Sequence, residues 1–165
     1  MTTHELASLT YFKAGERLLN GTPIDWDTIN YQTMFYVELL RGRLDSPVQL
    51  IRGAHPHRPE AVDVCCPGRS LKQIFMELTR IPCSWGIYSG NSVHLDTRPY
   101  ERVPARWLAV KSGEKGHLLG RGLMSLVTAE KDGWIYLSYG DPRSFEALTV
   151  VCDLAEKTQY KREEI

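Results

Sequence analysis

Two short segments carry the side chains whose types and spacing could do chemistry. The first spans positions 54–63 and reads AHPHRPEAVD, and the second spans positions 93–98 and reads VHLDTR. Because side chains alternate between the two faces of a strand, His94, Asp96 and Arg98 share one face of the second segment. The pattern is compatible with a polar site on that face. A half-exposed strand with a surface salt bridge would show the same pattern, and the pattern alone favours this second interpretation.

The first segment places a carboxylate in apolar surroundings. Asp63 lies in a strand predicted over 61–65, and a lone buried carboxylate requires a cation, a metal or several hydrogen-bond donors. His55 and His57 lie just upstream. Two histidines and one carboxylate, drawn from both segments, could hold a metal and leave a fourth position open for water, as catalytic zinc requires. The alternative is that His55 and His57 are loop residues without a ligand role, and spacing alone favours it.

Composition limits the classes of function. The chain has 165 residues, the length of one ordinary domain, and its 20 basic residues balance 20 acidic ones. A net charge of zero argues against a protein that mainly binds nucleic acid or an anionic membrane. The sequence contains no apolar run of membrane-spanning length and no signal-like start, so we expect a cytoplasmic protein, or one exported without a cleaved signal.

Cysteine usage indicates no structural metal site. The four cysteines are Cys65, Cys66, Cys83 and Cys152, and no C-x-x-C pair occurs among them. We expect buried, reduced thiols. A thiol enzyme is a third hypothesis for function, but the sequence shows no recognisable pairing of a cysteine with a histidine.

The elements that must position these residues follow from periodicity and turn signals. One or two short helices are predicted within 1–20, and a longer helix from Asp25, its N-cap, to just before Pro47. The remaining predictions are strands at 48–51 and 61–65, a helix capped by Ser70, a hairpin of strands 85–88 and 92–96, and a hairpin of strands 123–128 and 134–139. A last helix is predicted over 143–157, followed by a frayed tail from Lys161, and its apolar face carries Phe145, Leu148, Val151, Cys152 and Ala155. This order predicts a single α+β domain over 1–165, with a mostly antiparallel sheet and flanking helices.

Several motifs occur in an order that resembles a known family. They are Leu9-Thr10-Tyr11-Phe12 with Glu16, Leu50-Ile51-Arg52-Gly53, Ala61-Val62-Asp63-Val64 with Pro67-Gly68, Gly86-Ile87-Tyr88, Val93-His94-Leu95-Asp96-Thr97-Arg98, and Ala105-Arg106-Trp107. Over positions 1–109 they resemble the zinc D-alanyl-D-alanine carboxypeptidases of the hedgehog/DD-peptidase fold, especially the phage-endolysin-like branch. Positions 110–165 have no counterpart in this resemblance.

The resemblance implies a hydrolase that uses zinc to cleave peptides or peptidoglycan fragments, in a phage or prophage setting. It places the zinc ligands at Asp63, His94 and His57, with His55 as the alternative to His57. A zinc-activated water would attack a peptide carbonyl, with Asp96 or Glu60 as the catalytic acid or base. Substrate-binding roles would fall to Arg52, Arg98 and His55; Asp96 could instead orient His94 or pair with Arg98.

Three features depart from the family pattern. Pro56 stands at the usual position of the first ligand, the preceding loop is short, and Asn91 stands where several branches carry the general base. The alternative function is therefore a catalytically inactive member that kept the fold and acts as a binding or structural module.

Overall fold

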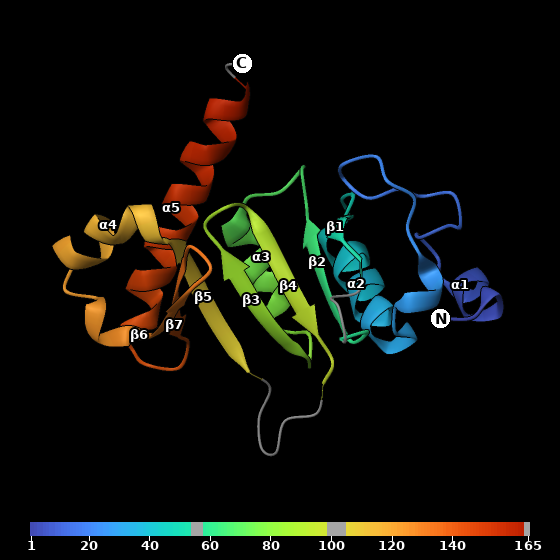
Figure 1. Cartoon of the computed structure of the whole chain (residues 1–165), viewed down its shortest axis with the longest axis horizontal. Coiled ribbons are helices and arrows are strands. Elements are labelled where there is room, and N and C mark those ends of the chain that lie inside the picture. Colours follow the sequence, from blue (N-terminus) through green and yellow to red (C-terminus); the bar gives the residue numbers. More distant parts are fainter. Residues whose placement is uncertain (54–57, 99–104, 164–165) are drawn as a thin grey trace. The chain divides into compact units, whose positions relative to one another are not determined.

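The structure, a computed structural model, describes residues 1–53, 58–98 and 105–163, with side chains up to residue 157. Within these ranges the chain is α+β, as predicted, with five α-helices and seven strands (Figure 1). The helices are α1 (Thr3–Ser8), α2 (Tyr31–Leu44), α3 (Leu71–Leu78), α4 (Lys115–Gly120) and α5 (Ser144–Glu163). The strands are β1 (Gln49–Arg52), β2 (Ala61–Cys65), β3 (Ser84–Tyr88), β4 (Ser92–Asp96), β5 (Arg106–Lys111), β6 (Val127–Lys131) and β7 (Trp134–Ser138).

The strands form an open, mostly antiparallel sheet in the order β1-β2-β4-β3-β5-β7-β6. The chain divides into two compact units. Unit 1 comprises Met1–Trp85 and Ser92–Ala105, and unit 2 comprises Gly86–Asn91 and Arg106–Ile165.

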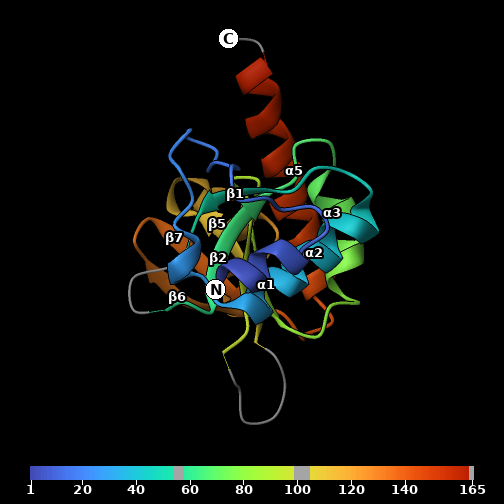
Figure 2. The same cartoon turned by 90° about the vertical axis from the view of Figure 1, so that its right-hand side faces the viewer.

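In unit 1, the strands β1, β2 and β4 pair antiparallel, and α2 lies beside α3 and β4 (Figures 1 and 2). The predicted helix at Ser70 is confirmed as α3. Its capping box is complete, because the Ser70 hydroxyl accepts from the Gln73 backbone N–H and the Gln73 side chain accepts from that of Ser70. The apolar face of α3 is buried, as its spacing predicts, through Leu71, Ile74, Phe75 and Leu78.

The long helix of unit 1 begins later than predicted. Asp25 makes no side-chain capping bond, and Trp26–Thr28 forms a short 3-10 turn instead. Asn30 caps α2 by accepting from the backbone N–H of Thr33 at 3.2 Å. The indole of Trp26 is buried and donates to the Ala14 carbonyl, a long-range contact that outweighs the local capping preference of Asp25. Between α1 and Trp26 the chain forms no helix, so a second N-terminal helix is not found.

In unit 2, the strands β5, β7 and β6 pair antiparallel, and α5 lies against β5 with α4 beside it (Figure 1). The predicted hairpin turn is confirmed, because Asp132 and Gly133 both have positive φ, 55° and 84°, as a type I′ turn requires. The first strand of the hairpin begins at Val127, after a 3-10 turn over Met124–Leu126. The sequence prediction missed α4.

The last helix is longer than predicted and runs to Glu163, through the tail expected to fray. Phe145 was placed on its apolar face, but 65% of its surface is exposed. The other four residues predicted for this face, Leu148, Val151, Cys152 and Ala155, are buried together with Ala147, and Phe145 precedes them at the solvent-facing start of the helix.

No disulfide joins the four cysteines, all of which lie among the described residues, as expected; Cys66, Cys83 and Cys152 are buried and Cys65 is half-buried. Among the described residues, no helix combines the length and the apolar character needed to cross a lipid bilayer.

Candidate functional site

The two chemically interesting segments meet on neighbouring strands of unit 1. In the antiparallel pairing of β2 with β4, Asp63 lies directly opposite His94. Their side chains point to the same face, and Asp63 Oδ1 lies 2.9 Å from His94 Nδ1. Asp63 is therefore not a lone carboxylate, and the imidazole of His94, which is 6% exposed, is its partner.

The second nitrogen of His94 faces another carboxylate. His94 Nε2 lies 3.3 Å from Asp96 Oδ2, and Asp96 is fully buried. The backbone N–H of Arg98 donates to Asp96 Oδ1 at 2.9 Å, and Arg98 Nε donates to Oδ1 at 3.0 Å and to Oδ2 at 2.8 Å. Asp63, His94, Asp96 and Arg98 thus form one chain of alternating charge, which we call the His94 network.

Opposing effects set the protonation of the His94 network. Burial alone would lower the pKa of His94, but the hydrogen bonds and negative charges of Asp63 and Asp96 outweigh it, and the pKa is raised. Burial alone would raise the pKa of Asp96, but its bonds to His94 and Arg98 hold that pKa well below the usual range. Asp96 is therefore ionised at neutral pH and can hold a proton on His94 Nε2.

Two members of the network fit a zinc ion. Two ligands of a tetrahedral zinc, each bonded at about 2.0–2.1 Å, lie about 3.3 Å from each other. Asp63 Oδ1 and His94 Nδ1, 2.9 Å apart, need to separate by only a few tenths of an ångström. Asp96 at Nε2 supplies the outer carboxylate that commonly orients a ligating histidine and leaves its other nitrogen free for the metal.

Both candidates for the third ligand, His55 and His57, lie outside the described residues. Within the described parts of the chain, no group of three His, Cys, Asp or Glu side chains is placed to hold a metal. The structure thus brings together two of the expected ligands, Asp63 and His94.

The remaining candidates are near by in the fold of unit 1. Arg52, at the exposed end of β1, pairs with Asp63 across the β1–β2 ladder. Arg98 is engaged with Asp96. Glu60 is half-buried immediately before β2, and its backbone carbonyl accepts from the Thr97 N–H at 3.1 Å.

Sequence reasoning missed one supporting group, the hydroxyl of Thr33. It is fully buried on α2, donates to the Glu60 carbonyl at 2.9 Å, and lies 2.8 Å from the Thr97 hydroxyl. The signal was a threonine among the apolar positions of an amphipathic helix, since a buried hydroxyl needs a partner. Thr33 ties α2 to the ends of β2 and β4, close to the network.

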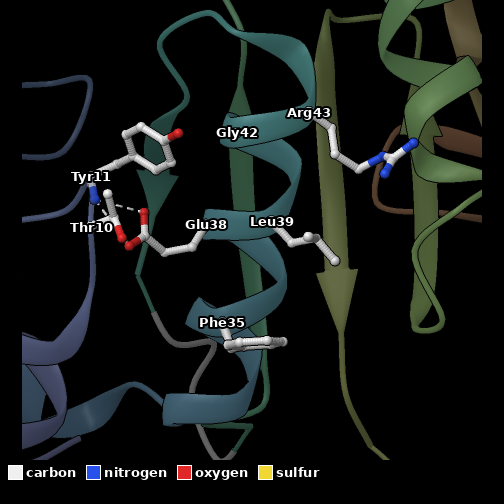
Figure 3. A pocket seen from close by; sticks show the side chains of 7 residues that line it. All are labelled: Thr10, Tyr11, Phe35, Glu38, Leu39, Gly42 and Arg43. Atoms are coloured by element: carbon white, nitrogen blue, oxygen red, sulfur yellow. Dashed lines mark hydrogen bonds between the residues drawn. The ribbon is translucent and has the colours of Figure 1, made fainter.

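A hollow lies along α2 in the same unit (Figure 3). Its volume is about 300 Å³, and its lining includes Tyr11, Phe35, Glu38 and Leu39. Both carboxylate oxygens of Glu38 accept from the backbone N–H of Tyr11, each at 3.0 Å. This carboxylate therefore fixes the N-terminal segment to α2.

Comparison of the chain with family models, curated proteins and solved structures gave no match.

Proposed function

We propose that the chain is a zinc-dependent peptidase that hydrolyses peptides of the peptidoglycan type. The observation that supports this proposal is the pair of Asp63 Oδ1 and His94 Nδ1, which face each other at 2.9 Å on neighbouring strands with Asp96 behind the imidazole. A carboxylate oxygen and an imidazole nitrogen are ordinary zinc ligands, and the motifs around them resemble those of the D-alanyl-D-alanine peptidases.

Residues of the chain would have separate roles in the proposed hydrolysis. Bound zinc would supply a Lewis acid that activates water and polarises the peptide carbonyl. Asp96, held by Arg98, keeps the proton on His94 Nε2 and fixes the plane of the ring, so it is a positioning residue. Arg52 lies opposite Asp63 and is exposed, so we assign to its guanidinium the binding of a substrate carboxylate through two parallel hydrogen bonds.

The proton acceptor in this proposal is Glu60. Asp96 was the other candidate, but it is fully buried and bonded to both His94 and Arg98. The side chain of Glu60 is half-buried, and the backbone at Glu60 is held by Thr33 and Thr97. We assign His57, with His55 as the alternative, to the third ligand position on the basis of the resemblance.

The test measures zinc content and peptide hydrolysis in parallel. We expect about one zinc per chain, lost in His94→Ala and in Asp63→Ala. His117→Ala is the matched control, because His117 is exposed and pairs with Glu114 on the surface of unit 2, so it should keep the metal. Hydrolysis of peptidoglycan fragments should disappear together with the zinc.

Two results would contradict the proposal. Stoichiometric zinc in both His94→Ala and Asp63→Ala would remove the assigned ligands. No zinc in the wild type, even when it is supplied, would favour the alternative of an inactive binding or structural module.

A further inference from the structure

The three paired strands of unit 2 have two unlike faces. Leu108, Val110, Ile135 and Leu137 are fully buried on one face. The other face carries half-buried aromatic rings, from Trp107 on β5 and from Trp134 and Tyr136 on β7. With Tyr88 from the neighbouring end of β3, these rings form what we call the aromatic face.

The pairing of the strands arranges this face in rows. Trp134 lies opposite Lys111 on one side and opposite Lys131 on the other. Tyr136, one row along, lies between Ala109 and Ala129. Since directly paired residues share a face, Trp134 stands between two lysines, and Tyr136 stands between two alanines, of which Ala109 is fully buried.

The rings are held in fixed orientations. The indole of Trp107 lies over Gly86, where a Cβ atom would overlap with it. Its Nε1 donates to the Tyr88 hydroxyl at 3.2 Å. The Tyr88 ring stands nearly perpendicular to those of Trp134, with centroids 5.0 Å apart, and Tyr136, with centroids 6.2 Å apart. Glycine is thus required at position 86 for a close approach.

We infer that the aromatic face binds a glycan strand that carries carboxylates. The face of an aromatic ring is the negative part of its quadrupole and attracts the partly positive C–H groups of a saturated sugar ring. Trp134 and Tyr136, both half-buried on β7, offer such surfaces. Lys111 and Lys131 add two positive charges on either side of Trp134, and the described residues of that row include no acid, because Glu130 pairs with Ile135 on the opposite face.

Single-stranded nucleic acid fits this surface less well. Such binders combine stacking rings with a positively charged groove along the phosphates. Here two lysines flank one ring, and the chain has no net positive charge. The edge-to-face packing of Tyr88 also leaves fewer ring faces free for successive bases. The inference uses residues of unit 2 alone, so it does not depend on the proposed peptidase activity.

The test is calorimetric titration of the whole chain with three probes. They are a peptide-free glycan of alternating N-acetylglucosamine and N-acetylmuramic acid, uncharged chitohexaose, and a thymidine oligonucleotide. We expect the carboxylated glycan to bind about fivefold more tightly than chitohexaose, the effect of two exposed ion pairs. The double variant Lys111→Ala/Lys131→Ala should abolish that difference and leave chitohexaose binding unchanged.

Gly86→Ala tests the close packing of Trp107 against Gly86 without deleting a ring. The added methyl group must displace the indole and, through its hydrogen bond, the Tyr88 ring that packs against Trp134 and Tyr136. Affinity for both glycans should therefore fall about tenfold, the loss of one stacking contact. Gly113→Ala is the control, because a Cβ there meets nothing within 4 Å. Tyr136→Ala gives a second test that does not need Gly86→Ala to fold, and circular dichroism verifies the folding of each variant.

Three results would overturn the inference. They are no binding of either glycan, unchanged glycan affinity in folded Gly86→Ala and Tyr136→Ala, or tighter binding of the oligonucleotide than of both glycans. The last would identify the face as a nucleic-acid surface.

Discussion

The His94 network in unit 1 and the aromatic face in unit 2 both display side chains on antiparallel strands, but different forces hold them in place. In the network, each charged group is buried or half-buried, and each is fixed by the opposite charge beside it. On the aromatic face, ring contacts and the absence of a side chain at Gly86 set the geometry.

This difference has an energetic consequence. A buried charge that loses its partner keeps its full desolvation cost, so removing one member of the network destabilises the others. A ring on a half-exposed face loses only its own contacts, because water can reach its neighbours. We therefore expect large, coupled effects in the network and smaller, local effects on the aromatic face.

The largest effect is expected for Asp96→Ala. The change leaves His94 Nε2 and the Arg98 guanidinium without their shared carboxylate, and we expect the free energy of unfolding to fall by about 3 kcal/mol or more. Glu114→Ala removes an exposed partner of His117 and should cost less than about 1 kcal/mol. Urea unfolding of both variants measures the difference. Similar losses would show that the network is no more coupled than a surface ion pair.

The next effect concerns zinc and rests on the proposed function. Asp96→Asn keeps the shape of the side chain but removes the charge that orients His94. Loss of such an outer carboxylate lowers metal affinity about 10–100-fold, and the stoichiometry should remain one zinc per chain. Competition with a chelator measures the affinity, with His117→Ala as the control. Unchanged affinity in Asp96→Asn would mean that Asp96 serves folding alone.

From the sequence, the face on which each strand carries its side chains could be predicted better than the pairing between strands. Alternation showed that His94, Asp96 and Arg98 share a face, because that depends only on local strand geometry. Asp63 and His94 are 31 residues apart in the sequence. Their pairing depends on the register between β2 and β4, which local patterns do not contain. The α2 cap shows the same limit, since Asp25 and Asn30 are both good capping residues and the burial of Trp26 decides between them.

The aromatic face was harder to predict. The turn at Asp132-Gly133 identified the hairpin that carries Trp134 and Tyr136, but Trp107 and Gly86 meet only because their strands are neighbours. A tryptophan and a glycine far apart in sequence give no local sign of contact.

A smaller loss of stability is expected on the aromatic face. Gly86→Ala adds a methyl group under the Trp107 indole, and moving a half-buried ring should lower the free energy of unfolding by about 1–2 kcal/mol. Gly113→Ala has open space around its Cβ and should change stability by less than about 0.5 kcal/mol. Thermal unfolding of the two variants compares them. A loss at Gly86 as large as that of Asp96→Ala would remove the contrast between the two regions.

The last effect tests whether the polarity of unit 1 is confined to the His94 network. Cys66, just after β2, is 2% exposed, and burial, with a contribution from Cys65, raises the pKa of its thiol from 9.0 to about 12. Below pH 9 the thiol is protonated in both the folded and the unfolded chain, so its titration does not change the free energy of unfolding in that range. Between pH 9 and 12 only the unfolded chain loses the proton, so stability falls as the pH rises.

Between about pH 8 and pH 10.5, the wild type should therefore lose about 1–2 kcal/mol more of its unfolding free energy than Cys66→Ala does. Urea unfolding at the two pH values measures both losses, and the variant cancels the titration of tyrosines and lysines common to both chains. Equal losses would mean that water or a cation reaches the end of β2. The His94 network would then belong to a wider polar region that water reaches. The network and the aromatic face would differ less in their exposure to water than the burial of Cys66 indicates.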